Sequence, residues 1–186
     1  RLNRRNCTGH VLRTSEVCRP AFGSLLTGIT YSETGGQTEF ANSCAAYEEL
    51  PQETKDRIAG FKVVHSFEIS MRNAGVEPTP ETLDYWCSLV PKAHNLVWTQ
   101  ISGRKSLVIG CSASHIESMD RDAGEKLLHE LLAWTTQPKF VYRHEWMPGD
   151  VLIWDNTGVL HRAEPYPVDS NRLMRRTTLV GEEPFA

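Results

Sequence analysis

Short apolar runs separated by turn-forming residues make up most of the chain. Residues 21–31 and 37–41 are typical of strands on either side of the turn sequence SETGG. Similar runs predict strands or extended segments at 62–70, 97–102, 105–110, 139–146, 148–156 and 175–183. The pair at 97–102 and 105–110 flanks Gly103 and Arg104, so we expect it to form a hairpin.

A second pattern, with apolar residues three and four apart, predicts helices. The strongest covers 119–137, where one face collects Leu127, Leu128, Leu131, Leu132 and Trp134. A shorter helix is expected over 44–50 with Ser43 as its N-cap. Another is expected over 51–61, with Pro51 in its first turn and Gly60 at its C-terminal end.

Residues 71–96 contain three prolines and no clear period, and predict a long loop with at most a helical turn after Thr79. Long loops inside compact domains are often functional, so this segment is a candidate lid. The whole pattern indicates one domain, residues 1–186, that is mainly β with inserted helices. Its β-rich second half, with Gly and Pro turns, suits a sandwich or a jelly roll.

Composition narrows the function. The 186 residues are 40% hydrophobic and 23% charged with a net charge of −3, which gives no reason to expect a nucleic-acid partner. No stretch approaches the ~18 apolar residues of a membrane span, and the basic start RLNRRNCTGH is not followed by the apolar run of a signal peptide. Five cysteines without a C-x-x-C pair argue against a disulfide framework or a zinc finger, and for a reducing, cytoplasmic compartment.

Most of the histidines have an ordinary structural interpretation. His129 occupies a polar position of the strongest predicted helix, where solvation is expected. His144 alternates with Tyr142 and Trp146 along a strand, so the three side chains should share a face. His115 lies among small polar residues just after a strand, which suits the edge of a substrate pocket.

His161 differs because of its surroundings. It ends the sequence MPGDVLIWDNTGVLH, in which a turn, an apolar strand and a second turn precede it, as suits a metal ligand at the mouth of a β-barrel. Arg172 and Arg176 lie further along the chain, four residues apart, so on a strand they share a face. Two arginines inside a β fold require anions, and the guanidinium fork binds carboxylates.

These segments resemble the taurine dioxygenase / 2,4-dichlorophenoxyacetate dioxygenase family of iron(II)- and 2-oxoglutarate-dependent oxygenases. The resemblance runs from about residue 6 to residue 184. It is strongest in GGQTEFANSCAAYEELP, GRKSLVIGCSASHI, QPKFVYRHEWMPGDVLIWDNTGVLHRAEPY and RLMRRTTLVGEEP. It implies a double-stranded β-helix, or jelly-roll, barrel.

The resemblance also implies roles for four residues. His161 matches the distal iron-binding histidine. Arg172 and Thr38, in GGQT, match the pair that holds the far carboxylate of the co-substrate 2-oxoglutarate. Arg176 matches an arginine that faces the acidic group of the substrate in members with anionic substrates. A solvated strand position is the alternative for Arg176, because Arg175 is adjacent and one of the two must face outward.

The first half of the expected metal site departs from the family. The family's facial triad takes two histidines and a carboxylate, with the first two ligands spaced His-x-Asp. His10 falls at the first histidine position if one residue is inserted before Phe22, and Leu12 then stands in place of the aspartate. Without the insertion, Val11 and Arg13 take the two places.

Three explanations of this departure stay open. The first is that His10 and His161 alone hold the iron, and the second is that a carboxylate such as Glu16 or Asp84 completes the site. The third is a degenerate relative that binds without oxidising. The family also has a substantial segment before its His-x-Asp, and nine residues precede His10 here, which indicates a missing or shortened N-terminal part.

The resemblance implies an enzyme, a dioxygenase that uses Fe(II), 2-oxoglutarate and O2. It would hydroxylate a small, acidic substrate, with an aromatic carboxylate as one expectation, and release succinate and CO2. A non-catalytic protein that binds 2-oxoglutarate or a partner on the same barrel is the main alternative, and a cupin-type metal enzyme would require a tighter histidine cluster than the sequence contains. Assembly into a homo-oligomer stays open.

Overall fold

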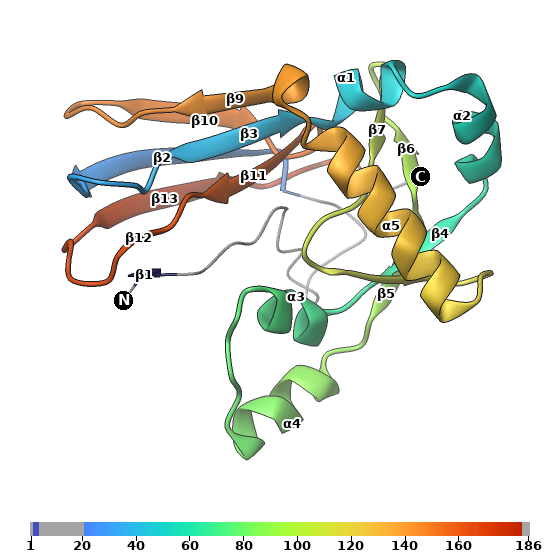
Figure 1. Ribbon diagram of the computed structural model, residues 1–186, viewed down its shortest axis with the longest axis horizontal. Coiled ribbons are helices and arrows are strands. Elements are labelled where there is room, and N and C mark those ends of the chain that lie inside the picture. The colour runs from blue at the N-terminus through green and yellow to red at the C-terminus, as the bar shows by residue number, and fades with distance from the viewer. Residues whose placement is uncertain (1, 4–20, 184–186) are drawn as a thin grey trace.

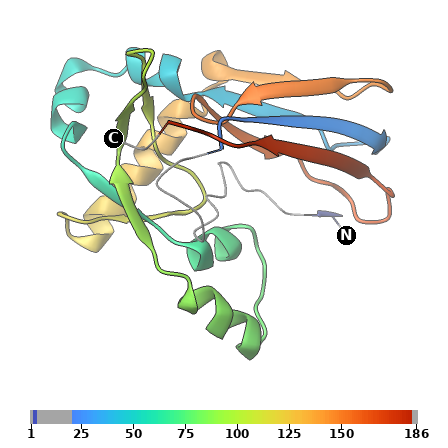
Figure 2. The same cartoon turned by 180° about the vertical axis from the view of Figure 1, so that it is seen from behind.

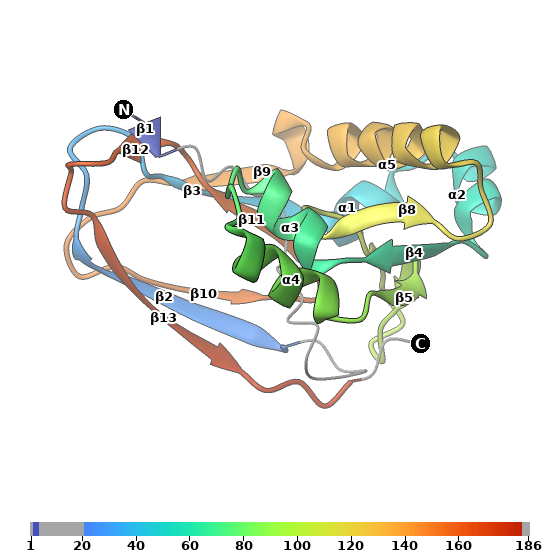
Figure 3. The ribbon, with the colours of Figure 1, turned by 90° about the horizontal axis from the view of Figure 1, so that it is seen from below.

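The computed structural model describes residues 2–3 and 21–183 of the chain. Two three-stranded antiparallel sheets form one half of the molecule, and they appear as two layers in Figure 3. One sheet has the order β10 (Val151–Asp155), β2 (Gly23–Thr30), β13 (Leu173–Leu179). The other has the order β11 (Val159–Ala163), β3 (Thr38–Asn42), β9 (Val141–His144).

The other half combines smaller sheets with helices (Figures 1 and 2). Its three-stranded sheet has the order β5 (Lys92–Asn95), β4 (Lys62–His65), β8 (Ala113–Ile116), beside the hairpin of β6 (Val97–Thr99) and β7 (Lys105–Leu107). The helices are α1 (Ser43–Glu48), α2 (Gln52–Ile58), α3 (Phe67–Asn73), α4 (Pro80–Ser88) and α5 (Arg121–Thr135), and a 3-10 turn covers Pro138–Phe140. A short pair joins β1 (Leu2–Asn3) to β12 (Tyr166–Pro167).

The mainly β architecture with inserted helices is as the pattern predicts, and β6 and β7 form the expected hairpin, with Trp98 opposite Ser106. The sequence did not reveal which strands pair. β2 and β3 are neighbours along the chain but lie in different sheets, and so do β10 and β11. Each connection therefore crosses from one layer to the other, and alternating polarity carries no information about that crossing.

The loop predicted over 71–96 is wrong, because the segment holds the end of α3, all of α4 and β5. Thr79 accepts a hydrogen bond from the Thr82 amide, and Pro80 occupies the first turn of α4, where its missing N–H costs nothing. Trp86 of α4 is buried and packs edge-on against Phe67 of α3, with ring centroids 6.3 Å apart. This packing, and not a sequence period, supports a short helix here.

Two further local predictions need correction. The extended segment predicted over 62–70 ends at His65, because Ser66 caps α3 by accepting from the Ile69 amide. The N-cap of α1 is Asn42 rather than Ser43, since the Asn42 side chain accepts from the Ala45 amide at 2.9 Å. The Ser43 hydroxyl instead bonds both backbone groups of Leu107, which ties α1 to β7.

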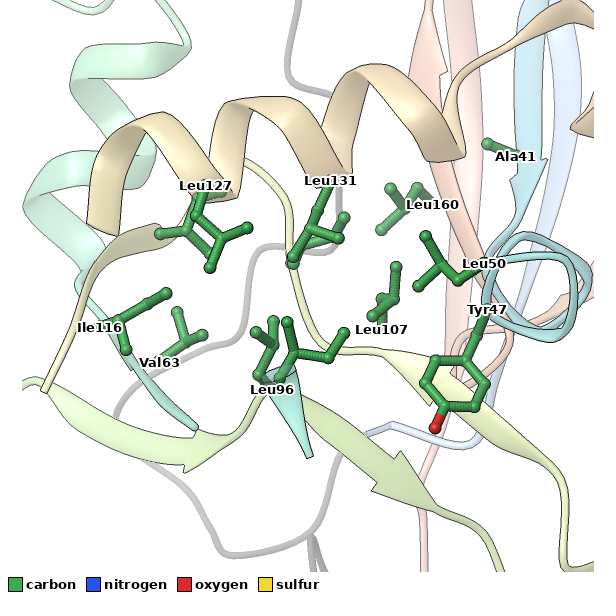
Figure 4. Close-up of a cluster of buried hydrophobic side chains, with 13 residues drawn as sticks. Ala41, Tyr47, Leu50, Val63, Leu96, Leu107, Ile116, Leu127, Leu131 and Leu160 are labelled. Carbon is green, nitrogen blue, oxygen red and sulfur yellow. The ribbon is translucent and has the colours of Figure 1, made fainter. Parts of the chain in front are cut away.

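The aliphatic core lies beneath α5, between this helix and strands β4, β7 and β8 (Figure 4). The face of α5 that carries Leu127, Leu128 and Leu131 is buried, as the helical spacing predicts. Leu160 of β11 and Ala41 of β3 belong to the same cluster, so one face of the β11-β3-β9 sheet contributes to the core. The opposite face of that sheet is turned toward the β10-β2-β13 sheet and does not belong to this core.

Two findings bear on location. No helix among the described residues is long and apolar enough to cross a membrane. Of the cysteines in residues 21–183, Cys44 and Cys111 are buried and Cys87 is exposed, and all three are free thiols.

Candidate active site between the two sheets

His161 lies on β11 opposite Phe40 of β3. Its ring centroid is 5.0 Å from that of Trp154, which comes from β10 in the other sheet, and 6.4 Å from that of Phe40. Phe40 and Trp154 are themselves 5.1 Å apart, so the three rings bridge the two layers. The imidazole predicted to bind metal therefore points into the space between the sheets.

The period-2 alternation of β11 explains this direction. Leu160 points to the opposite face, where it is buried in the aliphatic core. Arg162 also points to that face, where it forms an ion pair with Glu39 of β3. The aromatic side chains and the aliphatic core thus occupy opposite faces of one sheet.

Thr38 begins β3 and is 3% exposed. It shares a face with Phe40, two residues along the strand, so its side chain belongs to the same interior space. The indole N–H of Trp146 donates to the Thr38 hydroxyl oxygen at 3.0 Å. The sequence indicates only that Trp146 shares a strand face with His144, and it contains no signal for the contact of Trp146 with Thr38.

Arg172, immediately before β13, reaches across to the segment that precedes β3. Its guanidinium donates to the Gly36 carbonyl at 3.0 Å and stacks on Tyr166, with its central carbon 4.8 Å from the ring centroid. Arg172 and Thr38 are thereby brought to the same end of β3, as the resemblance implies for two groups that bind one carboxylate.

The double glycine of GGQT makes this approach possible. Gly36 has φ +76°, and a Cβ added there would meet Nε of Arg172 at 2.9 Å. Gly35 has φ +73°, and a Cβ there would collide with the Pro165 carbonyl. Both positions thus require glycine, for conformation and for space. Two adjacent glycines in a turn are a signal for such a close approach, but the sequence analysis used them only as turn formers.

Arg176 on β13 also points between the sheets. Its guanidinium lies 5.5 Å from the centroid of Trp154 and donates to the Ser24 hydroxyl at 2.8 Å. Ser24 is fully buried and is held in turn by the Asn156 side chain at 3.0 Å. Burial lowers the pKa of the Arg176 guanidinium, because desolvation disfavours its charged form.

Neither Arg172 nor Arg176 forms an ion pair with a carboxylate within the residues that the structure describes. The step between Leu173 and Met174 skips a residue on β2, so the irregularity lies in the partner strand. Arg172, just before β13, and Arg176 on β13 both direct their guanidiniums toward the space between the sheets. Two cations, a buried hydroxyl and an imidazole between apolar rings form a site whose chemistry suits an acidic ligand.

The other histidines lie elsewhere. His115 is on β8, and its ring bonds the neighbouring Ser114 hydroxyl rather than any group around His161. His129 is exposed on α5, as predicted. His144 contacts both Tyr142 and Trp146 through its ring, which confirms their shared face.

The first metal position cannot be placed on the structure. His10, Leu12 and Glu16 lie outside the described residues, and Asp84 is exposed on α4. Among the residues described, no group of three His, Cys, Asp or Glu side chains converges on a point that could hold a metal ion. His161 is the expected ligand that the structure does place.

Two facing sheets, with a histidine and two arginines directed toward the space between them, make up a β-sandwich whose interior suits a small anion. The family comparison makes this specific. Residues 12–178 match the model of the taurine catabolism dioxygenase TauD, TfdA family, and the chain belongs to that family.

Relatives and solved structures agree with this assignment. An alpha-ketoglutarate-dependent 2,4-dichlorophenoxyacetate dioxygenase of Burkholderia sp. (strain RASC) is 42% identical over 159 residues, which is 85% of this chain and 53% of that protein. An alkylsulfatase of Acinetobacter baylyi is 32% identical over 86% of this chain and 52% of its own length. The crystal structure of AAD-2 in complex with Mn(II) and N-oxalylglycine matches with a TM-score of 0.86 and 36% identity, over 99% of this chain and 71% of that one.

The chain thus spans about half the length of the curated relatives it matches.

Proposed function

We propose that the protein is an Fe(II)- and 2-oxoglutarate-dependent dioxygenase that hydroxylates a small acidic organic substrate and releases succinate and CO2. The observation that supports the proposal is that Arg172 and Arg176 both reach from the β13 region toward the elements that carry Thr38 and His161, with no ion pair to a carboxylate among the described residues. The names of the relatives that the chain resembles support it.

In this proposal each residue has one task. His161, together with His10, holds the iron, which when bound supplies the activation of O2. Arg172 and Thr38 bind the distal carboxylate of 2-oxoglutarate, and the aromatic rings around His161 exclude water from the reacting groups. Imidazole is a suitable iron ligand, and a guanidinium beside a hydroxyl donor suits a carboxylate.

Arg176 is the proposed contact for the acidic group of the substrate. Its cation rests on Trp154 and is oriented by Ser24, which leaves the remaining N–H groups of its fork for an anion. The relatives' names include a phenoxyacetate, a phenoxypropionate and a sulfate ester, which are all anionic organic molecules. These two facts support an acidic substrate, and the phenoxyacetate and phenoxypropionate in the relatives' names favour one that is carboxylated and aromatic. His115 remains a lower-ranked contact, because it lies on a different sheet.

The architecture proposed to carry this chemistry is a jelly-roll barrel in a single domain, residues 1–186. The two crossing connections between its sheets support this topology. The segment 71–96 is the proposed lid, now as helix α4 and strand β5 rather than as a loop. The free thiols of the described cysteines support a reducing, cytoplasmic environment, and the proposed partners are small molecules.

The second candidate function is binding without oxidation, and Leu12 favours it. With leucine at the matching carboxylate position, iron would be held by two neutral imidazoles and would bind weakly. Iron titration separates the candidates. The degenerate site predicts weak binding that 2-oxoglutarate strengthens, and at least tenfold tighter binding after Leu12→Asp. Tight stoichiometric iron in the unaltered chain without 2-oxoglutarate would show that another carboxylate, such as Glu16, completes the site.

Calorimetry with Mn(II) and 2-oxoglutarate tests the main proposal. We expect the chain to bind 2-oxoglutarate, and Arg172→Ala to weaken this binding more than a hundredfold, because removal of one partner of a buried charge pair costs ~3–5 kcal/mol. Circular dichroism should show an intact fold in the variant. Unchanged affinity for 2-oxoglutarate would refute the role of Arg172.

A further inference from the structure

Trp146, just beyond the end of β9, places its indole N–H 3.0 Å from the Thr38 hydroxyl oxygen. We propose that Trp146 is a positioning residue that turns the Thr38 hydroxyl into a dedicated donor for the distal carboxylate of 2-oxoglutarate. This inference rests on the proposed function, because it explains how the proposed carboxylate site selects its ligand.

The argument follows from the inventory of a hydroxyl group. A threonine hydroxyl has one hydrogen to donate and two lone pairs that accept. An indole N–H can only donate, so it occupies a lone pair of Thr38 and leaves the hydroxyl hydrogen for another acceptor. Within residues 21–183 the Thr38 hydroxyl has no hydrogen-bond partner besides Trp146. Its hydrogen is therefore available to a ligand at the end of β3.

The location of Thr38 decides which ligand can use that hydrogen. Thr38 is 3% exposed, so water competes poorly for its hydroxyl. The guanidinium of Arg172, which has only donors, reaches the same end of β3 through Gly36. Two donors at this end of β3 suit a carboxylate, which has only acceptor oxygens, and match groups that carry N–H or O–H hydrogens poorly.

Several contacts hold Trp146 in place. Its ring stands edge-on to that of His144, with centroids 4.8 Å apart, and lies 6.3 Å from that of Tyr31. His144 is opposite Thr38 in the strand register, and its Nε2 is 3.0 Å from the Asp150 carboxylate. The same Asp150 oxygen accepts from the amide of Met147, the residue after Trp146. The indole is thus fixed by the β9–β10 turn and cannot easily rotate away from Thr38.

The test is a double-mutant cycle on Trp146→Phe and Thr38→Val, read by calorimetry with Mn(II) present. Thr38→Val should bind 2-oxoglutarate about tenfold more weakly, as expected for the loss of one hydrogen bond to a charged group. Trp146→Phe should lose several-fold and no more than this, because the Thr38 hydroxyl remains but is no longer oriented. The double variant should lose no more than Thr38→Val alone rather than the product of the two single losses, because Trp146 acts only through the Thr38 hydroxyl. All three should bind 2-oxopentanoate, which lacks the distal carboxylate, as the unaltered chain does.

Trp134→Phe is the matched control, because Trp134 also uses its indole N–H once, on the Ala46 carbonyl at 2.9 Å. It should leave 2-oxoglutarate affinity unchanged. Multiplicative losses in the cycle, or an equal loss for 2-oxopentanoate, would overturn the inference while leaving the proposed function standing. Absence of 2-oxoglutarate binding by the unaltered chain would overturn the proposed function, and the inference with it.

A spectroscopic readout covers the case in which Trp146→Phe does not fold. The chain has five tryptophans, so a 15N spectrum of the unaltered protein holds at most five indole N–H signals. Thr38→Val should move one of them strongly, and 2-oxoglutarate added to the unaltered protein should move the same one. If 2-oxoglutarate leaves that signal in place while it binds, Trp146 does not act on the carboxylate site.

Discussion

The two faces of the β11-β3-β9 sheet border interiors of opposite character. Toward α5, Leu160 and Ala41 join a cluster of aliphatic side chains. Toward the other sheet, His161 and Phe40 face Trp154, and the two inward arginines approach the same space. One interior is filled by its own side chains, whereas the other presents two arginines that form no ion pair with a carboxylate among the described residues, which suits an anionic ligand. The first should therefore govern stability and the second should govern binding.

A core truncation gives the largest effect on stability. Leu131 is 3% exposed in the aliphatic cluster, so Leu131→Ala should lower the free energy of unfolding by about 2–5 kcal/mol through lost burial and a residual cavity. Urea denaturation measures the loss. Ile153→Ala on β10, where the side chain is 70% exposed, is the control and should cost far less. Similar losses for the two variants would mean that the aliphatic cluster does not dominate stability.

The second prediction concerns the space between the two sheets, where Arg176→Ala removes a cation. Arg176→Ala should weaken binding of phenoxyacetate, used as an acidic probe, by ten- to a hundredfold, the loss expected for a charge-assisted hydrogen bond of ~1.5–3 kcal/mol. Affinity for 2-oxoglutarate should change much less. The free energy of unfolding should change by under ~1 kcal/mol, because Arg176 is exposed on β13 and forms no ion pair among the described residues.

Arg175→Ala is the matched control, since Arg175 is the next residue on β13 and faces the opposite side of the sheet. It should leave the affinities for both ligands unchanged. An equal loss of phenoxyacetate and 2-oxoglutarate in Arg176→Ala would mean that Arg176 supports the barrel rather than a substrate.

The sequence predicts the helices and strands better than it predicts which strands pair. The helix α5 and the hairpin of β6 and β7 follow from local periods and turns, because the contacts that stabilise them are close along the chain. The pairing of β2 with β10 and β13 joins segments more than a hundred residues apart. Such pairing depends on how the layers close, and a single sequence does not encode it in any short window.

The candidate site shows the same division. His161, Arg172 and Arg176 could be selected from their spacing and charge, and the structure brings all three to the space between the sheets. The residues that orient them escaped notice. Ser24 and Trp146 are ordinary strand residues in the sequence, and their roles arise from contacts across sheets. Those contacts become visible only when distant segments are placed together.

The buried histidine His65 on β4 permits the last test, which concerns the dependence of stability on pH. Burial, and then repulsion from His94, lower the pKa of His65 to about 3, whereas an unfolded histidine titrates near ~6.5. Between these values the unfolded state binds the extra proton, so stability is fully present above pH 6.5 and is lost as the pH falls toward 3. The slope is about 1.4 kcal/mol per pH unit, or roughly 2 kcal/mol between pH 7 and pH 5.

Urea denaturation at several pH values measures this slope. His65→Gln should flatten the slope, while His129→Gln, at an exposed position of α5, should retain it. An unchanged slope in His65→Gln would show that other groups set the acid sensitivity.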